Sequence, residues 1–521
     1  MGKKVMLRCI ALLLVLVTLS VMVIGCGGDT DPVDPGKKPS DSTGKDTGSA
    51  DDSGNDSDSE VETGDKPIEV IDMDGYVFNV LARVTSWFAN EVTAEDETGD
   101  LVLQSIYDRN FNIEERYNCI LESTFMDEGK SGWTIWQTSV NSGENAYKAS
   151  LNHMMDTATE ALNGSMLNLL DLGDYVNLDA SYWNQSMNKE LIINNRLYFT
   201  ANEYCTSSVY FTWLMIFNME MADQKGIDVY GMVDDGTWTY DSLYDIVSKS
   251  YADDGNGVVD LATDTFGLVT HYNTVLTNYL FAFEVPVVHI DNSGKVVFDY
   301  NDPNTMMNSV VEKIYDLLFE SNNGAFYMTE AAHAAAYSGL LHDDAIATKF
   351  ATNTSLFSNI RLLALETLRS AEATYGIVPF PKYTEEQQNY HSHVDGRGSL
   401  IFAPYTLPEN EYENVGILLD ALAKETQEVI MPVITKTALI GRYSEDQQAY
   451  NCLKMIFDGR TYAFAYVYDF STTSHPYWAI VNCMSAKSDS FTDYWKAKSR
   501  TAEREINQIY SKYAKLHSSK K

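Results

Sequence analysis

The acidic loop Ala252–Asp264 has the residue types and spacing that come closest to a metal site in this chain. Three of its side chains fall at the ligand positions of a calcium-binding loop: Asp254, Asn256 and Asp260. Ala252 stands where such a loop has its first aspartate, and Thr263 stands where it has its bidentate acid. Because two charged ligands are missing, the sequence favours a solvated turn. We therefore expect no cofactor, with calcium as the alternative.

Enzymatic chemistry has no clear signature elsewhere. The chain lacks the GxSxG, HExxH and GxxxxGK[ST] patterns of serine hydrolases, zinc peptidases and nucleotide-binding loops. A glycosidase needs two carboxyl groups at a defined separation, and 74 acidic residues are too many for the sequence to select a pair. We expect a protein that is not an enzyme. A secreted carbohydrate-active enzyme, suggested by the 12% aromatic content, is the first alternative.

The cysteines do not form a recognisable metal or redox motif. Four of them lie outside the first 26 residues: Cys119, Cys205, Cys452 and Cys483. None belongs to a CxxC pair, so neither a zinc ribbon nor a thioredoxin-like site is indicated. Export would permit disulfides, but the sequence predicts buried thiols.

Residues 1–26 predict an export signal that ends in a lipidated cysteine. Basic residues precede the apolar run Ile10–Ile24, which is too short to span a bilayer comfortably as a permanent helix. Gly25 and Cys26 follow, and this ending resembles the cleavage box of bacterial lipoproteins. The alternative is an ordinary signal peptide cleaved before a free thiol. We expect a protein anchored through Cys26 at the extracellular face of the cell membrane.

A disordered acidic tether is predicted for residues 27–67, which consist almost entirely of Asp, Ser, Gly, Thr, Pro and Lys. Such a composition cannot bury enough apolar surface to offset the entropy lost on ordering. As a flexible coil the segment would span about 35 Å. The whole chain carries a net charge of −37, which repels nucleic acid and excludes it as a partner.

The remaining chain begins with an alternation typical of a parallel α/β sheet. Residues 76–82 read as a buried strand, 99–118 as an amphipathic helix and 119–124 as a second strand. After a further strand at 399–403 the pattern becomes chiefly helical to the C-terminus. We therefore predict an α/β fold with a mainly helical C-terminal part.

The order of segments resembles that of the extracellular solute-binding proteins of bacterial ABC importers, of the sugar-binding kind. Four stretches carry the resemblance: GDLVLQSIYDRNFNIEERYN, LLDLGDYVNLDASYWNQSMNKELIINNRLYF, GTWTYDSLYDIVSKSYADDGNGVVDLATDTFGL and YGIVPFPKYTEEQQNY. Together they extend over most of the chain after residue 68. Each stretch alone is weak, whereas their order is fairly specific.

The resemblance implies a two-lobe, periplasmic-binding-protein-like fold of type II with hinge crossings between its lobes. The first lobe would comprise 68–202 and 348–405, and the second lobe 203–347 and 406–521. A small solute, a mono- or oligosaccharide in the first instance and a peptide in the second, would bind in the cleft. The protein, expected to be a monomer, would deliver it to the permease subunits of an ABC transporter. The remaining alternative is an adhesin or partner-binding lipoprotein.

Position in these segments, together with the resemblance, selects the candidate ligand-binding residues: Trp87, His153, Met154, Glu203, Tyr204, Phe357, Arg361, Arg397 and Tyr462. Trp87 follows the first strand, at the edge where α/β sheets bind ligands. Each has an ordinary alternative, such as packing for Tyr462 or a helix-start charge for Arg361. Use of Arg361 or Arg397 in the cleft leads to the hypothesis that the ligand is an acidic sugar.

Overall fold

The computed structural model describes residues 65–84, 91–95, 99–127, 130–369, 374–439, 447–468 and 475–517, all within the compact unit Glu62–Lys521. The predicted signal peptide with Cys26, most of the predicted tether, and Trp87 lie outside these residues. None of the helices in the described part is both long and apolar enough to cross a bilayer.

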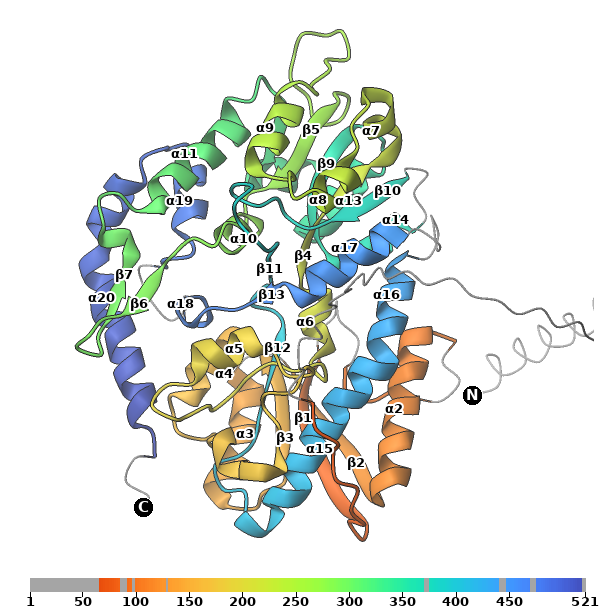
Figure 1. The fold of residues 1–521 in the computed structure, drawn as a ribbon, viewed down its shortest axis with the longest axis vertical. Coiled ribbons are helices and arrows are strands. Elements are labelled where there is room, and N and C mark those ends of the chain that lie inside the picture. The colour runs from red at the N-terminus through yellow and green to blue at the C-terminus, as the bar shows by residue number, and fades with distance from the viewer. Residues whose placement is uncertain are drawn as a thin grey trace, which may run out of the picture. The chain divides into compact units, whose positions relative to one another are not determined.

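The first sheet contains four strands in the order β12-β3-β1-β2 (Figure 1). They have these bounds: β1 Tyr76–Val84, β2 Cys119–Asp127, β3 Ala149–His153 and β12 Ser399–Phe402. β1 pairs in parallel with β2 and β3, and β12 returns antiparallel along β3. The middle of β1, Val80–Ala82, is buried, as expected for an apolar strand inside an α/β sheet.

Helix α2 (Leu101–Tyr117) confirms the helix predicted after the first strand. It begins where it does because the Asp100 carboxylate accepts hydrogen bonds from the backbone N–H groups of Val102 and Leu103, at 2.8 and 3.0 Å. It ends at Asn118, whose φ of 48° lies in the left-handed region that asparagine tolerates.

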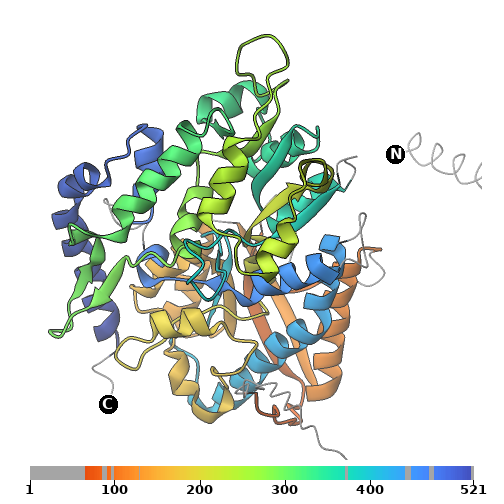
Figure 2. The same ribbon diagram turned by 45° about the horizontal axis from the view of Figure 1, so that its top comes forward.

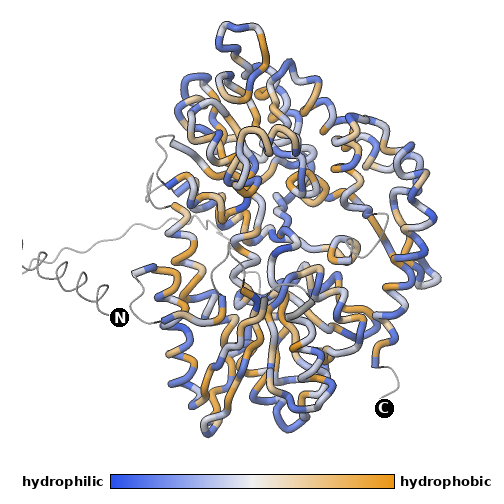
Figure 3. Tube along the Cα trace, turned by 180° about the vertical axis from the view of Figure 1, so that it is seen from behind, coloured by the Kyte–Doolittle hydropathy of each residue, from blue (hydrophilic) through white to orange (hydrophobic). Residues whose placement is uncertain are grey.

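The second sheet contains five strands in the order β10-β4-β9-β5-β8. Their bounds are β4 Trp213–Asn218, β5 Phe266–His271, β8 Ala325–Met328, β9 Ser355–Arg361 and β10 Tyr375–Val378. β5 is parallel to β8 and β9, whereas β4 runs antiparallel to β9 and β10. Figure 3 shows that apolar stretches follow the strands of both sheets and that polar residues dominate many of the outer turns.

Helices cover both sheets. Those of the first lobe are α3 Lys130–Ser142, α4 Met154–Ala161, η1 Leu169–Tyr175, α5 Gln185–Leu191 and α15 Tyr412–Glu425. Those of the second lobe are α7 Met219–Lys225, α8 Val229–Asp234, α9 Tyr240–Ser248, α10 Val275–Ala282, α11 Met306–Phe319, α12 Glu330–Ala336, α13 His342–Phe350, α14 Leu365–Leu368, α17 Gln447–Asp458, α19 Ala479–Ser485 and α20 Phe491–Lys515. Figure 2 shows α11, in green, beside the blue C-terminal helices α19 and α20.

Two segments lie in a different lobe from the one predicted. The sequence assigned 348–405 to the first lobe, but β9 and β10 pair in the second sheet, and within this range only β12 joins the first. β9 is buried throughout and is held between β4 and β5, so its apolar residues are satisfied there. The sequence assigned 406–521 to the second lobe, but α15 packs against α2 and η1 of the first.

Polar contacts explain why α15 stays on the first lobe. The Asp420 carboxylate of this helix accepts hydrogen bonds from the indole of Trp183 and the backbone N–H of Asn177, both at 2.7 Å. Glu425, at its end, pairs with Arg116 of α2 at 3.0 Å. The hydrogen-bond and ion-pair partners of its buried polar groups thus decide to which lobe α15 belongs. Apolar periodicity alone does not reveal this assignment.

Crossing segments connect the lobes through a small parallel pair, β11 (Ser392–His393) with β13 (Arg460–Thr461). The His393 ring is fully buried, stacks on Phe281 at 4.1 Å and meets Tyr466 edge-on. Burial lowers the pKa of His393 to about 3, against an opposing contribution from Asp395. His393 therefore packs as a neutral aromatic side chain at this junction.

Replacing His393 by phenylalanine should reduce the acid sensitivity of the fold. Because the pKa is near 6.5 in the unfolded chain and lower in the folded one, protonation favours unfolding as pH falls below about 6.5. This residue should cost the wild type about 2 kcal/mol of unfolding free energy between pH 8 and pH 5. Urea unfolding at both values should show a correspondingly smaller loss for His393→Phe. An unchanged loss would mean that His393 is charged in the folded protein.

Candidate functional site

The ends of strands from both sheets converge on one crossing segment, Asp395–Ser399. From the first sheet, Arg83 near the end of β1 bonds to the Arg397 carbonyl oxygen and donates to the Ser399 hydroxyl at 3.3 Å. From the second sheet, Arg361 at the end of β9 pairs with Asp395 at 3.3 Å. Ligands of α/β proteins bind at such carboxyl ends, so this junction is where a site is expected.

Arg361 forms the centre of a buried charge cluster. Its guanidinium contacts the carboxylates of both Asp343 and Asp395, and it lies 5.2 Å from the centre of the Phe211 ring and 5.3 Å from that of Trp213. Burial opposes its charge, but the two carboxylates outweigh this and raise the pKa of Arg361. In return, although burial acts the other way, Arg361 and His271 lower the pKa of Asp343 to about 2.

Three histidine rings extend this cluster toward α12. His271, at the end of β5, lies 3.3 Å from Asp343 and stacks on His342, which in turn stacks on His333 of α12. Burial and the two neighbouring histidines lower the pKa of His342 to about 4. The His342 ring is therefore uncharged near neutral pH.

Of the predicted ligand residues, His153, Met154, Arg361 and Arg397 are brought to this crossing segment. His153 ends β3 opposite Ser399, and burial together with Arg83 lowers its pKa to about 3. Met154 is fully buried, and its N–H donates to the Gly398 carbonyl at 3.1 Å. Their proposed contacts with a ligand stay predictions.

Glu203, Tyr204 and Tyr462 gather at a second place on the hinge. The Glu203 carboxylate pairs with Arg460, whose guanidinium also donates to the Ser208 hydroxyl at 3.3 Å. The Tyr204 ring lies under the buried Arg109 guanidinium, 4.6 Å away. The Glu203–Arg460 pair holds the segment that crosses from the first lobe to the second against β13. Glu203 and Arg460 also line a cavity of about 500 Å³ beside α16 (Met431–Leu439).

Phe357 occupies a packing position rather than the predicted cleft position. Its side chain is fully buried, with the Trp238 ring at 5.3 Å and the Phe217 ring at 6.4 Å. It lies in the middle of β9, where alternation turns it into the core of the second lobe. Trp213, for which the sequence favoured the core, is also fully buried and contacts His271 at 5.7 Å.

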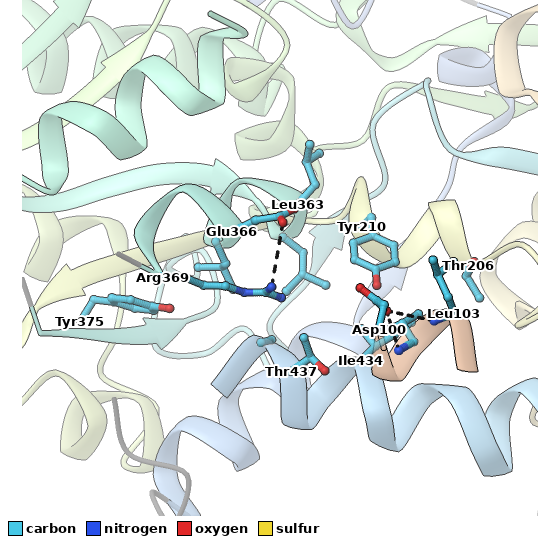
Figure 4. A pocket seen from close by; sticks show the side chains of 14 residues that line it. Asp100, Leu103, Thr206, Tyr210, Leu363, Glu366, Arg369, Tyr375, Ile434 and Thr437 are labelled. Atoms are coloured by element: carbon cyan, nitrogen blue, oxygen red, sulfur yellow. Dashed lines mark hydrogen bonds and ion pairs between the residues drawn. The ribbon is translucent and has the colours of Figure 1, made fainter. Parts of the chain in front are cut away.

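A cavity of about 230 Å³ lies between elements of the two lobes (Figure 4). The first lobe contributes the start of α2, with Asp100 and Leu103. The second contributes η3 (Leu362–Ala364), which follows β9 directly, and α14 with the adjoining Arg369. The hinge elements α6 (Thr206–Tyr210) and α16 complete the wall. A solute held here would touch both lobes at once.

Polar and apolar residues line this cavity in about equal measure. Arg369 and Glu366 face each other at 3.9 Å on one side. On the other side, Figure 4 shows the Tyr210 hydroxyl beside the Asp100 carboxylate. Burial, with Asp100 adding to it, raises the pKa of Tyr210, so its hydroxyl stays protonated. A concave wall of this kind, with apolar surface and a few polar groups that can fix an orientation, can hold a small molecule.

Sequence reasoning missed several residues of this region, among them Asp343, Asp395, His271, Tyr210 and Arg369. Asp395 had a signal, because the stretch Asp395–Gly398 places two glycines around Arg397. A Cβ on Gly396 would come within 2.6 Å of the Met155 methyl carbon, so only glycine fits without a shift of that side chain. Asp343 had none, since an acid at a helix start is common.

The acidic loop forms a cluster different from the predicted one. Asp253, Asp254 and Asp264 have carboxylate oxygens within 4.8 Å of one another, whereas the sequence selected Asp254, Asn256 and Asp260. The Asp264 carboxylate already accepts hydrogen bonds from the N–H groups of Asp254 and Asp260, at 3.0 and 2.9 Å. These bonds account for the loop without an ion, and calcium stays a prediction.

No protein-family model and no curated protein matches the sequence, but solved structures do. A family 1 extracellular solute-binding protein from Bifidobacterium longum subsp. infantis is 11% identical and covers 84% of this chain and 99% of its own, with a TM-score of 0.50. The chain has the fold of the extracellular solute-binding proteins. This confirms the predicted two-lobe α/β fold.

Two further structures with the solute-binding fold match equally well. The ABC substrate-binding protein Lmo0181 from Listeria monocytogenes, in complex with cycloalternan, is 11% identical over 84% of this chain and 100% of its own, with a TM-score of 0.50. UgpB from Mycobacterium tuberculosis, in complex with glycerophosphocholine, is 15% identical over 83% of this chain and 99% of its own, with a TM-score of 0.50. At these identities the likeness is one of fold.

Removing the Arg361 charge should strongly destabilise the protein. Arg361→Met leaves Asp343 and Asp395 buried without their guanidinium, and breaking a buried pair in this way costs about 3–5 kcal/mol. Urea unfolding measures this loss. Lys249→Met, which breaks an exposed ion pair with Asp245, is the matched control and should cost about 0.5 kcal/mol or less. Equal losses in the two variants would contradict a central role for Arg361.

Proposed function

We propose that this protein is a lipid-anchored solute-binding protein that captures a sugar between its lobes and passes it to an ABC importer. The observation that carries the proposal is the cavity of about 230 Å³ whose wall comes from α2 in one lobe and from η3 and α14 in the other. A ligand that touches both lobes would favour their closed arrangement through its differential affinity for the two states.

The electrostatics of the site support binding over hydrolysis. A glycosidase needs one carboxyl group kept protonated as the general acid beside an ionised one. Burial raises the pKa of Asp343 and Asp395, but Arg361 together with their other charged and hydrogen-bonding partners outweighs burial and lowers the pKa of both. Two carboxylates that are both ionised at neutral pH can orient a guanidinium but cannot donate a proton. We therefore infer that no chemical step takes place in this cluster.

Sugar is the ligand class that best suits the cavity wall. The wall combines leucine side chains with the hydroxyl groups of Thr206, Tyr210 and Thr437. A sugar ring presents an apolar face and a hydroxyl-bearing edge, so it can use both kinds of surface. The cycloalternan bound by one of the two similar proteins is a carbohydrate, which agrees with this choice. No cofactor enters the proposal.

The location follows from the sequence. Cys26 would carry the lipid, and the acidic stretch 27–67 would hold a monomeric binding unit clear of the membrane while it meets the permease subunits.

Filling the cavity should abolish ligand binding. Ala438→Trp places an indole on the α16 side of the cavity, whereas Ala335→Trp makes the same change on the exposed α12. The test is a thermal-shift and calorimetric screen against mono- and oligosaccharides. A sugar that binds should raise the melting temperature of the wild type and of Ala335→Trp. Ala438→Trp should lose at least about tenfold in affinity. Equal binding by both variants would place the ligand elsewhere, and a sugar converted to product would favour an enzyme.

Replacing Cys26 should release the protein from the membrane. The lipid is linked to the protein through the thioether of Cys26, and this link cannot form in Cys26→Ser. The variant should therefore move from the membrane fraction to the medium or periplasm. Labelling with a radioactive or clickable fatty acid should be lost in the same variant. Cys119→Ser, at a buried cysteine, is the control and should keep both the label and the membrane location. Labelling of Cys26→Ser would disprove lipidation at this residue.

A further inference from the structure

The arginines at the lobe junction are already matched by groups of the protein itself. Arg361 contacts two carboxylates, Asp343 and Asp395. Arg460 contacts the carboxylate of Glu203. An anionic ligand in this region would have to compete with carboxylates that are fixed and buried, which leaves it no advantage from the guanidinium groups.

Arg83 is also engaged by the protein. Its guanidinium bonds to the Ser399 hydroxyl and the Arg397 carbonyl, and the same Ser399 hydroxyl donates to Glu91. The Glu91 carboxylate is buried and also accepts from the backbone N–H of Ser207 at 2.9 Å. An acid therefore accompanies this arginine as well, at the point where the crossing segment enters the first sheet.

The helix end that faces the cavity is likewise occupied. The N-terminus of a helix as long as α2 attracts anions because its first N–H groups have no partner within the helix. Here Asp100 lines the cavity and its carboxylate takes two of these N–H groups, Val102 at 2.8 Å and Leu103 at 3.0 Å. A carboxylate or phosphate on the ligand would meet Asp100 instead of free donors.

The net charge of the cavity wall points the same way. Its ionisable residues are Asp100, Glu366 and Arg369, so two acids face one base, and the base is already 3.9 Å from Glu366. His153, which ends β3 opposite Ser399 of the crossing segment, adds no positive charge to the junction at neutral pH because burial and Arg83 lower its pKa to about 3. The chain as a whole carries −37 and repels anions at longer range.

From these observations we propose that the interlobe site selects an uncharged sugar and excludes acidic ones, with the Asp100 carboxylate as the group that discriminates. This inference rests on the proposed sugar-binding function and narrows its ligand class. An acidic ligand would meet the like charge of the Asp100 carboxylate, whereas a neutral one would not. This proposal replaces the part of the sequence hypothesis in which Arg361 would select an acidic sugar, because the charge of Arg361 is taken by Asp343 and Asp395. The part that concerns Arg397 stays a prediction.

The size of the cavity limits the bound unit. Sites for drug-sized ligands occupy about 300–1,000 Å³, and this cavity has about 230 Å³. A single sugar ring therefore fills it, either as a monosaccharide or as one terminal unit of a longer chain. The apolar face of that ring would meet leucines such as Leu362 and Leu363, and its hydroxyl groups would meet Thr206 and Tyr210.

The test compares matched sugars on the full chain at pH 7. Each neutral sugar is paired with the uronate that differs from it only by a carboxylate at C6. Glucose and galactose are measured first, and the corresponding disaccharides next. Calorimetry should show the neutral member binding at least about tenfold more tightly, equivalent to about 1.4 kcal/mol. Equal or tighter binding of the uronate would overturn this inference and leave the sugar-binding function standing. Binding of no sugar in the panel would overturn both.

A charge-removing variant tests the residue assigned to the exclusion. Asp100→Asn keeps a good N-cap for α2 and removes the carboxylate, so the preference for the neutral sugar should fall by at least about threefold through tighter binding of the uronate. Asp228→Asn is the matched control, because Asp228 caps α8 in the second lobe in the same way and does not line the cavity. Unchanged preference in Asp100→Asn, with circular dichroism like that of the wild type, would overturn the role of Asp100.

Discussion

The buried contact of Arg361 with Asp343 and Asp395 is the interaction on which the rest of the structure depends. It joins three pieces: the end of β9, the start of α13, 18 residues earlier, and the segment that crosses to the first sheet. A guanidinium removed from water is costly unless its charge and its N–H groups are matched. The fold meets this requirement only when all three pieces are in place, which ties the second sheet to the hinge.

A second arginine does the same for the first sheet. Arg83 holds the crossing segment two residues beyond Asp395, through the Arg397 carbonyl and the Ser399 hydroxyl. Between the two anchors lies Gly396, whose N–H donates to the Tyr466 hydroxyl at 3.1 Å. Each lobe thus binds one end of the segment Asp395–Ser399. A change in the angle between the lobes has to be absorbed by the few residues between these two anchors.

The same matching of charges defines what the site can recognise. Arginines that would attract an acidic ligand are used to build the junction, and the N-terminus of α2 is closed by Asp100. What faces the cavity is a set of leucines, hydroxyl groups, one weak ion pair and the Asp100 carboxylate. Recognition then depends on shape, stacking and neutral hydrogen bonds, which suit an uncharged ring.

Much of the architecture could be predicted from the sequence. The alternation of apolar strand, amphipathic helix and strand from Tyr76 to Asp127 predicts a parallel α/β sheet, and the structure confirms it. Apolar periodicity depends on neighbours along the chain, so it is written in the local sequence. The grouping of His153 and Arg397 near the hinge was also predictable, because both follow or precede strands of one sheet.

The amino-acid sequence by itself determined the α/β class and the order of segments that resembles solute-binding proteins. Only the tertiary structure decided that β9 and β10 belong to the second sheet, that Phe357 is a core residue, and that Arg361 is neutralised. The physical reason is that strand pairing and charge compensation join residues far apart in the chain. A local pattern shows that a segment is apolar or a side chain is charged, but the partner that satisfies it is chosen by the folded whole.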